Sequence, residues 1–167
     1  LSIGPAGLIE LYLSKLFVTP HAGIGITLFH AFVIVGLTEE ACKFIMIRFH
    51  AYRLPEFNEP FDGIVYAAFV GLGFATTENI FYVLNGGWGI GLVRMFTSVP
   101  AHYSFAVIMG YYMGKAKFAQ KHRALYMLTG LLLASLLHGA YDFFILQQNM
   151  PVLAILTIGV LMLSLRI

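Results

Sequence analysis

Long apolar segments, separated by short polar or glycine-rich stretches, fill almost the whole chain. A helix that crosses a bilayer needs about 20 predominantly apolar residues, and several of these segments are that long. The sequence therefore predicts an all-α, polytopic transmembrane helix bundle with five to six spans. Residues 1–18 fit either a short, tilted span or an interfacial amphipathic helix, and we favour the span. The other predicted spans are 22–47, 62–84, 88–114, 124–146 and 152–167.

Basic residues in the loops predict how these spans are oriented. Lysine and arginine collect in two loops separated by two spans, and because cytoplasmic loops are enriched in both, we expect both loops to be cytoplasmic. These residues are Arg48, Arg53, Lys115, Lys117, Lys121 and Arg123, whereas 19–21, 85–88 and 147–151 contain no Lys or Arg. Residues 19–23 are predicted to separate the first helix from the second. Asp62 is predicted to be the N-terminal cap of the helix that begins there.

Composition agrees with a membrane-embedded chain. Of the 167 residues, 59% are hydrophobic and 11% charged, whereas soluble domains are roughly 25% charged. The net charge of +2 gives no reason to expect a nucleic-acid partner. Cys42 is the only cysteine, which excludes an internal disulfide and a cysteine-based zinc site. We expect residues 1–167 to form one membrane-embedded domain, and because the chain begins at Leu1, we expect N-terminal spans to be missing.

Three charged residues interrupt the apolar segment at 22–47. Glu39 and Glu40 are adjacent, and Lys43 follows one helical turn later. A charge near the centre of a bilayer costs roughly 2.5 to 3.5 kcal/mol on insertion scales. We therefore expect these residues to face a polar site inside the bundle.

Small residues recur at every fourth position in three other spans. Positions four apart lie on nearly the same face of a helix, and small residues on such a face let membrane helices approach closely. Polar residues on or beside these rows are therefore expected to point into the bundle. The rows are Gly63, Ala67, Gly71, Ala75 and Asn79, with Glu78 beside the end; Ser98, His102, Ala106, Gly110 and Gly114, with Arg94 before it; and Gly130, Ala134, His138 and Asp142.

The ionisable residues on four spans could share one site. They are Glu39, Glu40, Glu78, His102, His138 and Asp142. A carboxylate and a histidine can together deprotonate a water while a second histidine donates to an oxyanion. Two histidines and a carboxylate are equally a zinc ligand set with a position open for water. His138 and Asp142, four residues apart, can address one centre, or Asp142 can orient the His138 ring.

Structural roles compete with these functional ones. Glu39 and Lys43 could form an ion pair, and a single membrane histidine more often bonds a neighbouring helix. Arg94 could reach the external surface or bind a substrate carboxylate or carbonyl. Intramembrane acids and histidines also mark ion pathways, so a proton or ion transporter or channel is the main alternative function. A non-enzymatic scaffold is a third.

Four motifs, taken together, resemble the PrsW family of intramembrane proteases, and more distantly the CAAX prenyl endoproteases and bacteriocin-processing relatives. The resemblance covers about residues 36–145. Its motifs are Glu39-Glu40-x-x-Lys43, Phe61–Tyr66 running on to Gly71–Asn79, Arg94 to His102, and His138-Gly139-Ala140-Tyr141-Asp142.

The resemblance implies a multi-pass protease of the bacterial or archaeal cell membrane that makes the first cut in a membrane-bound anti-sigma factor. It implies that Glu39 and Glu40 are the essential acidic pair, that Glu78 and His102 belong to the second and third motifs, and that His138 and Asp142 form the fourth. CAAX proteases have an arginine where this chain has Lys43, and commonly an asparagine at the position of Asp142. The wider superfamily includes both metal-dependent and metal-free proposals, so zinc or no cofactor both remain open.

We therefore predict an intramembrane endopeptidase for a single-span membrane protein or a lipid-anchored peptide. Glu39 or Glu40, helped by His102, would activate water, and His138, oriented by Asp142, would stabilise the oxyanion or hold a metal. The predicted metal ligands are His102, His138 and then Glu78, and the supporting residues are Lys43, Asn79 and Arg94.

This prediction makes a geometric demand. Glu39 or Glu40 must lie within hydrogen-bonding reach of His102 and His138, directly or through one water or metal. Along a helix rising about 1.5 Å per residue, the acidic pair falls about 8 Å to the cytoplasmic side of its span's centre. His102 falls near the middle of the span 88–114, and we expect the helix of the acidic pair to continue beyond the membrane through Arg53.

Overall fold

The structure, a computed structural model, describes residues 3–17 and 23–167. Within them it is helical, with no strand, which confirms the predicted all-α class. Most of the break predicted at 19–23 lies outside the described residues. The helices are α1 (Ile3–Phe17), α2 (Ile24–Phe29), the π-helix η1 (His30–Leu37), α3 (Thr38–Phe49), the 3-10 turn η2 (Ala51–Arg53), α4 (Pro60–Gly86), α5 (Trp88–Phe96), α6 (Ser98–Phe118), α7 (Arg123–Leu146) and α8 (Met150–Ser164).

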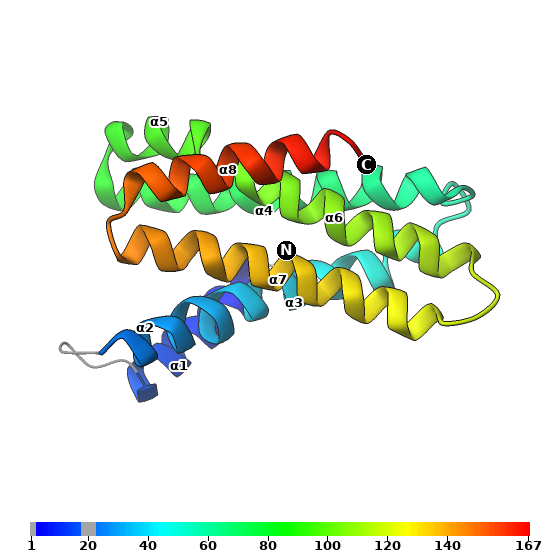
Figure 1. Cartoon of the computed structure of the whole chain (residues 1–167), viewed down its shortest axis with the longest axis horizontal. Helices are drawn as coiled ribbons and strands as arrows, with labels where there is room; N and C mark the ends of the chain where they lie inside the picture. The colour runs from blue at the N-terminus through cyan, green and yellow to red at the C-terminus, as the bar shows by residue number, and fades with distance from the viewer. Residues whose placement is uncertain (1–2, 18–22) are drawn as a thin grey trace.

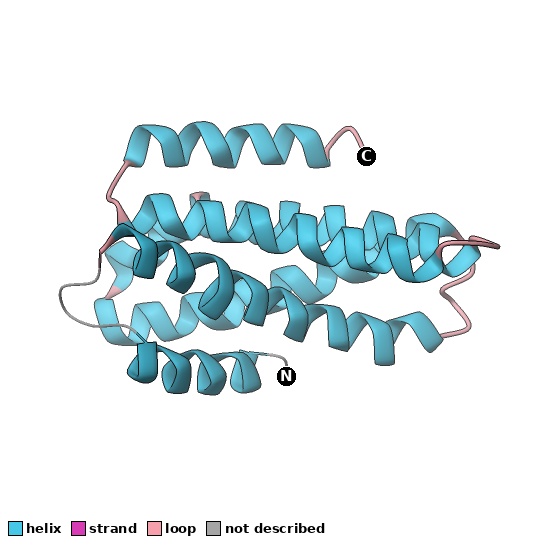
Figure 2. Cartoon of the chain, turned by 60° about the horizontal axis from the view of Figure 1, so that its bottom comes forward, coloured by secondary structure: helices cyan, strands magenta, loops and turns pink. Residues whose placement is uncertain are grey.

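Helix α6 is the centre of the bundle. It packs mainly against α4 and α7, while η1 packs against α7. Helices α1 and α8 lie at opposite edges (Figure 2). The connections α3–α4 and α6–α7, which carry the basic residues, lie at the same end of the bundle (Figure 1), as the sequence predicts.

Three stretches are long and apolar enough to cross a membrane, namely Ile24–Arg53, Pro60–Gly86 and Arg123–Leu146. The chain is therefore a membrane protein. Helices α1 and α8 have 15 residues each, fewer than the about 20 that a perpendicular span needs. The number of spans, predicted as five to six, stays a prediction.

The rows of small residues lie where helices approach most closely. Gly63 of α4 faces the backbone of Gly110 and Gly114 on α6, so closely that a Cβ atom on Gly63 would clash with both. On the other side of the bundle, a Cβ atom on Gly36 would lie 2.9 Å from the backbone nitrogen of Gly139. Only glycine allows these approaches, and they set the distance between the helices that carry the polar residues.

The segment 88–114, predicted as one continuous span, is two helices, and this prediction was wrong. Helix α5 ends at Phe96 and α6 begins at Ser98. Pro100 has no N–H to bond the carbonyl of Phe96, so it suits the first turn of a new helix and not the interior of a long one. His102 is consequently the fifth residue of α6 and lies near its beginning, not near the middle of a span.

The start of α4 also differs in detail from the prediction. Asp62 is not the N-cap residue, because the helix begins at Pro60 and Glu59 precedes it. Asp62 still caps this end from inside the first turn, where its Oδ2 accepts hydrogen bonds from the backbone N–H groups of Asn58 and Glu59, both at 2.9 Å. Its carboxylate thus satisfies two donors of the loop.

The helix of the acidic pair continues beyond Phe44 as predicted, through Phe49 and then the turn Ala51–Arg53. Its eight-residue π-helix, His30–Leu37, was not predicted. Apolar residues fill that stretch on all sides, so its hydrophobic pattern contains no sign of a wider turn. π-helical turns are often found at functional sites, and this one ends at Leu37, two residues before Glu39.

A glycine substitution tests the α4–α6 contact. We expect Gly63→Ala to lower stability by about 1 to 3 kcal/mol, because the added methyl group overpacks a backbone contact. Gly73→Ala on the same helix is the matched control, since a Cβ atom there meets no atom within 4 Å. Thermal unfolding in detergent measures both. Equal stability of the two variants would contradict the packing described.

Candidate active site

Glu40 joins the acidic helix to α7 at the centre of the bundle. It is fully buried, and its Oε1 lies 2.7 Å from Lys43 Nζ and 2.8 Å from His138 Nδ1. Because a carboxylate receiving an ammonium acts as acceptor, we assign the Nδ1–H of His138 as the donor to Glu40. Gly36, one turn before Glu40, closely approaches Gly139, which directly follows His138, and this approach makes the contact possible.

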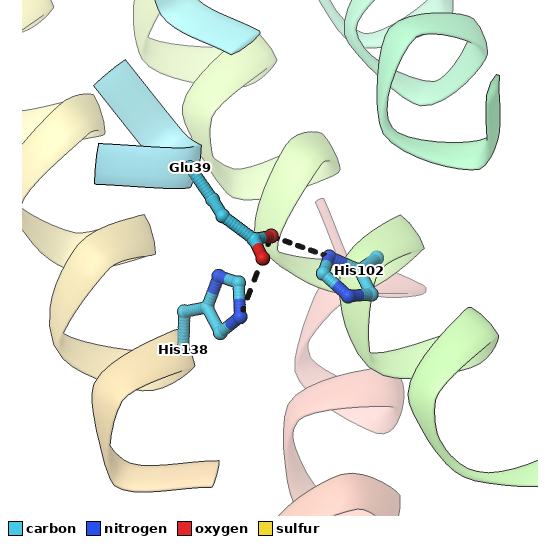
Figure 3. A group of neighbouring side chains, drawn as sticks. All are labelled: Glu39, His102 and His138. Atoms are coloured by element: carbon cyan, nitrogen blue, oxygen red, sulfur yellow. Dashed lines mark ion pairs between the residues drawn. The ribbon is translucent and has the colours of Figure 1, made fainter. Parts of the chain in front are cut away.

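Glu39 takes a different position from its neighbour. Its Oε2 lies 3.8 Å from His138 Nε2 and 3.9 Å from His102 Nδ1, so its carboxylate sits between the two rings (Figure 3). Lys43 Nζ lies 3.4 Å from the same oxygen. The three residues come from α3, α6 and α7. The geometric demand made from the sequence is therefore met by Glu39 for both histidines and by Glu40 for His138.

His102 is held between a cation and an acid. Its Nδ1 lies 2.9 Å from Lys43 Nζ, and its Nε2 lies 3.0 Å from Glu78 Oε2. An ammonium can only donate, so Nδ1 accepts from Lys43 and the proton of a neutral ring sits on Nε2, facing Glu78. The ring also packs at 4.8 Å, nearly perpendicular, against the ring of His138.

His138 has an acid at each ring nitrogen. Glu40 bonds Nδ1, and Asp142 Oδ2 lies 3.3 Å from Nε2, one turn further along α7. Phe105 stacks on the ring at a centroid distance of 5.2 Å. The ring is thus fixed on its face by α6 and at its edges by α3 and α7.

Arg94, Glu78 and Asn79 attach α5 to this cluster. Arg94 Nη2 lies 2.8 Å from Glu78 Oε2, and its guanidinium covers the ring of Tyr82 at 3.7 Å. Asn79 Nδ2 donates to the carbonyl of Gly91 at 3.2 Å. The Arg94 guanidinium contacts Glu78, which in turn contacts His102. The substrate-binding role considered for Arg94 from the sequence stays a prediction.

Burial makes Lys43 indispensable to the acidic pair. Glu39, Glu40 and Lys43 are 4%, 0% and 1% exposed. One ammonium contacts both carboxylates and a histidine, so no buried acid of the pair lacks a cation. Removing one partner of a buried ion pair typically costs 3–5 kcal/mol, because the remaining charge is left uncompensated.

The family model described as PrsW family intramembrane metalloprotease matches residues 1–166. The chain belongs to the PrsW family. This confirms the resemblance inferred from the four motifs.

Three relatives, each named Protease PrsW, illustrate the similarity. The protein of Geobacillus kaustophilus is 48% identical over 119 residues, which cover 71% of this chain and 53% of the relative. That of Bacillus subtilis is 43% identical over 120 residues, 71% of this chain and 55% of the relative. That of Clostridioides difficile is 36% identical over 139 residues, 80% of this chain and 58% of the relative. The chain thus spans about half the length of the curated relatives it matches, and no solved structure matches it.

The family description includes a metal, and the cluster offers a ligand set for one. Glu39, His102 and His138 each present a ligand atom, and these atoms lie within 4.8 Å of one another. The opposite ring nitrogens contact Glu40 and Glu78, as the outer nitrogens of metal-binding histidines usually contact carboxylates. The donor set therefore fits zinc once the Lys43 ammonium, 2.9 Å from His102 Nδ1, has left that nitrogen.

The third ligand in this group is not the one expected from the sequence. The sequence analysis proposed Glu78 beside His102 and His138, but the structure groups Glu39 with them. Glu78 lies on the far side of the His102 ring, where it contacts Nε2 and Arg94. Spacing along α4 could not distinguish which edge of that ring Glu78 would reach.

All six predicted site residues of this PrsW-family chain lie in the cluster, and Lys43 and Arg94 contact them directly. Sequence reasoning missed Glu10 of α1, whose carboxylate lines the same cavity as Glu39 and Glu78. The signal was present, since Glu10 is an acid in an apolar segment.

Lys43→Met tests the metal site. We expect zinc to bind at least tenfold more tightly, because removing a positive charge a few ångströms away is worth about 4 kcal/mol at an effective dielectric constant of about 20. We also expect zinc to raise the unfolding temperature of this variant more than that of the wild type.

Isothermal titration and metal analysis by mass spectrometry, after treatment with a chelator, measure the binding. Lys121→Met, in the exposed loop, is the control for lost charge alone. Zinc affinity that is unchanged or lower in Lys43→Met would contradict the metal site drawn here.

Proposed function

We propose that this PrsW-family chain is an intramembrane endopeptidase that hydrolyses a peptide bond of a membrane-bound substrate with water activated at the Glu39–histidine cluster. One observation carries the proposal. The carboxylate of Glu39 lies between the rings of His102 and His138, and Glu39 is also one of the residues that line a cavity of about 480 Å³. A substrate in that cavity would therefore meet the cluster at Glu39.

Glu39 is the general base in this proposal. Glu40 is fully buried and its Oε1 is shared by Lys43 and His138, so it positions other groups and does not face the cavity. Glu39 would take a proton from a water held between its carboxylate and the ring of His138, and pass that proton to the leaving amine. General-base catalysis of this kind contributes about 10²- to 10⁴-fold.

The histidines have different tasks. The Nδ1 of His102 accepts from Lys43, so its ring holds the ammonium beside Glu39 and is not a second base. His138 is fixed through Nδ1 by Glu40, and its Nε2 lies on the side of Glu39 and Asp142. With Nδ1–H already donated to Glu40, a proton on Nε2 makes His138 an imidazolium held between Glu40 and Asp142. That Nε2–H would stabilise the oxyanion that forms on the peptide carbonyl.

A metal would be held by Glu39, His102 and His138, and when bound it would polarise the carbonyl and acidify the water. Lys43 would then be the neighbouring cation that stays with Glu40. In either state, Glu40 and Glu78 hold the two rings from behind.

The substrate class and the location in the cell membrane are also proposals. We infer a multi-pass protein of the cell membrane whose substrate is a single-span membrane protein or a lipid-anchored peptide, as in the anti-sigma-factor cleavage that the family implies. Membership of a protease family does not favour the transporter alternative. Residues 1–167 are proposed to act as one domain.

Glu39→Gln and Glu40→Gln distinguish the base from the positioning residue. We expect Glu39→Gln to lower kcat by about 10³-fold, within the range of a lost general base. Glu40→Gln should lower activity by about 10- to 100-fold, as the loss of a carboxylate behind a histidine does. Cleavage of a panel of single-span proteins in proteoliposomes measures both.

Glu56→Gln, in the exposed loop before α4, is the control and should cleave like the wild type. Activity that survives in Glu39→Gln but not in Glu40→Gln would reverse the two roles. Full activity in both variants, or ion flux without cleavage in the same vesicles, would refute the peptidase.

A further inference from the structure

A groove runs along the seam between α1 and α4, beside the start of α3. Its larger part has a volume of about 480 Å³ and reaches Glu39 and Glu78. A second part of about 290 Å³ continues toward Met46. Ile3 and Phe74 line both parts, so the two cavities adjoin at these side chains.

Helix α1 forms one wall of this groove and is loosely attached. Ala6 is its only buried residue, and Leu8 and Tyr12 are 71% and 65% exposed. It lies at the edge of the bundle, apart from the central helices (Figure 2). Near its far end, Ser14 Oγ lies 3.1 Å from His30 Nε2 and connects it to η1.

The α1 side of the groove has room for another chain. Gly4 and Gly7 line it, and a Cβ atom on either would meet no atom within 4 Å. A peptide bond inside an α-helix has its carbonyl engaged in a backbone hydrogen bond. A substrate that presents its carbonyl to Glu39 must therefore unwind locally, and its side chains then need space of this kind.

Of the three acidic residues that line the groove, Glu10 is the one without an ion pair among the described residues. Glu39 contacts Lys43, and Glu78 contacts Arg94. Glu10 forms no ion pair within residues 3–17 and 23–167, and its Oε1 is buried without a hydrogen-bond partner there. A buried polar atom without a partner destabilises the protein, and a bound partner would remove that cost.

We propose that the α1–α4 groove binds the unwound segment of the substrate polypeptide, and that Glu10 determines specificity by accepting a lysine or arginine side chain next to the scissile bond. This rests on the proposed peptidase function. In this proposal the substrate enters sideways from the membrane, along the α1–α4 seam, and not from the aqueous ends of the bundle.

Photocrosslinking tests the groove without relying on cleavage. Benzoylphenylalanine is placed at position 8, whose leucine lines the groove, in the Glu39→Gln background, with a single-span substrate that carries a lysine beside the expected cut. We expect a crosslink to that substrate. The same probe at position 158 of α8, where Ile158 is 58% exposed, is the lipid-facing control and should give none.

Gly7→Trp fills the groove, and Gly159→Trp on α8 is its matched control. A Cβ atom meets no atom within 4 Å at either glycine, so both variants are expected to fold, which thermal unfolding checks. We expect Gly7→Trp to lower the position-8 crosslink, and cleavage in the chain that retains Glu39, at least tenfold. Gly159→Trp should change neither.

Glu10→Lys tests the specificity residue by charge reversal. We expect kcat/KM for a substrate with lysine beside the cut to fall at least tenfold, and that for a substrate with glutamate at the same place to rise. Glu10→Gln should lower the preference for lysine without reversing it. An unchanged ratio in Glu10→Lys would overturn the role of Glu10.

The outcomes separate the two proposals. A substrate crosslink at position 8 with no cleavage by the wild type would support the groove and refute the peptidase. Cleavage by the wild type with no crosslink at position 8 would overturn the groove alone. A crosslink at position 8 only to this protein or to a second copy of it would also overturn the groove.

Discussion

The buried ammonium of Lys43 is the interaction on which the rest of the cluster depends. It lies within 3.4 Å of both carboxylates of the acidic pair and 2.9 Å from His102. Two adjacent acids inside an apolar bundle would otherwise repel each other without water to screen them. Because Lys43 follows on the same helix, the pair and its counter-ion enter the bundle as one preassembled unit, and α6 and α7 supply only the rings that surround it.

Close helix packing brings those rings into place. Small residues on α4, α6 and α7 let backbones approach, as the contacts of Gly63 and Gly130 with α6 illustrate. In a bilayer, lipid tails are as apolar as the side chains, so moving apolar side chains from lipid into helix contacts gains little free energy. Van der Waals packing and interhelical hydrogen bonds therefore hold such a bundle together. The same rows of residues therefore serve both stability and the alignment of His102 and His138 with Glu39.

The helical class, the buried rows and the six clustered residues could be predicted from the sequence, because a charge in an apolar span must find a partner and four-residue spacing identifies its face. The break before Ser98 could not be predicted, since Pro100 is compatible with either a kink or a helix start. The contact of Glu78 with Nε2 of His102 could not be predicted either, since it depends on the rotation of α4 against α6. Assigning Glu10 to the site requires knowing where α1 packs, and no periodic pattern in that short segment indicates its position.

Adjacent identical residues here have unequal roles, and the inequality arises from helix geometry. Successive residues on a helix point about 100° apart, so when Glu40 faces His138 in the bundle interior, Glu39 is turned toward the seam with α1 and α4. Glu40 is thereby fully engaged, while Glu39 reaches both rings at 3.8 and 3.9 Å and also lines the groove. At these distances Glu39 forms no direct hydrogen bond with either ring, so a water or an ion that contacts the rings can contact its carboxylate as well. We therefore propose that Glu40 serves the structure and Glu39 the chemistry, on the side where the α1–α4 groove lies.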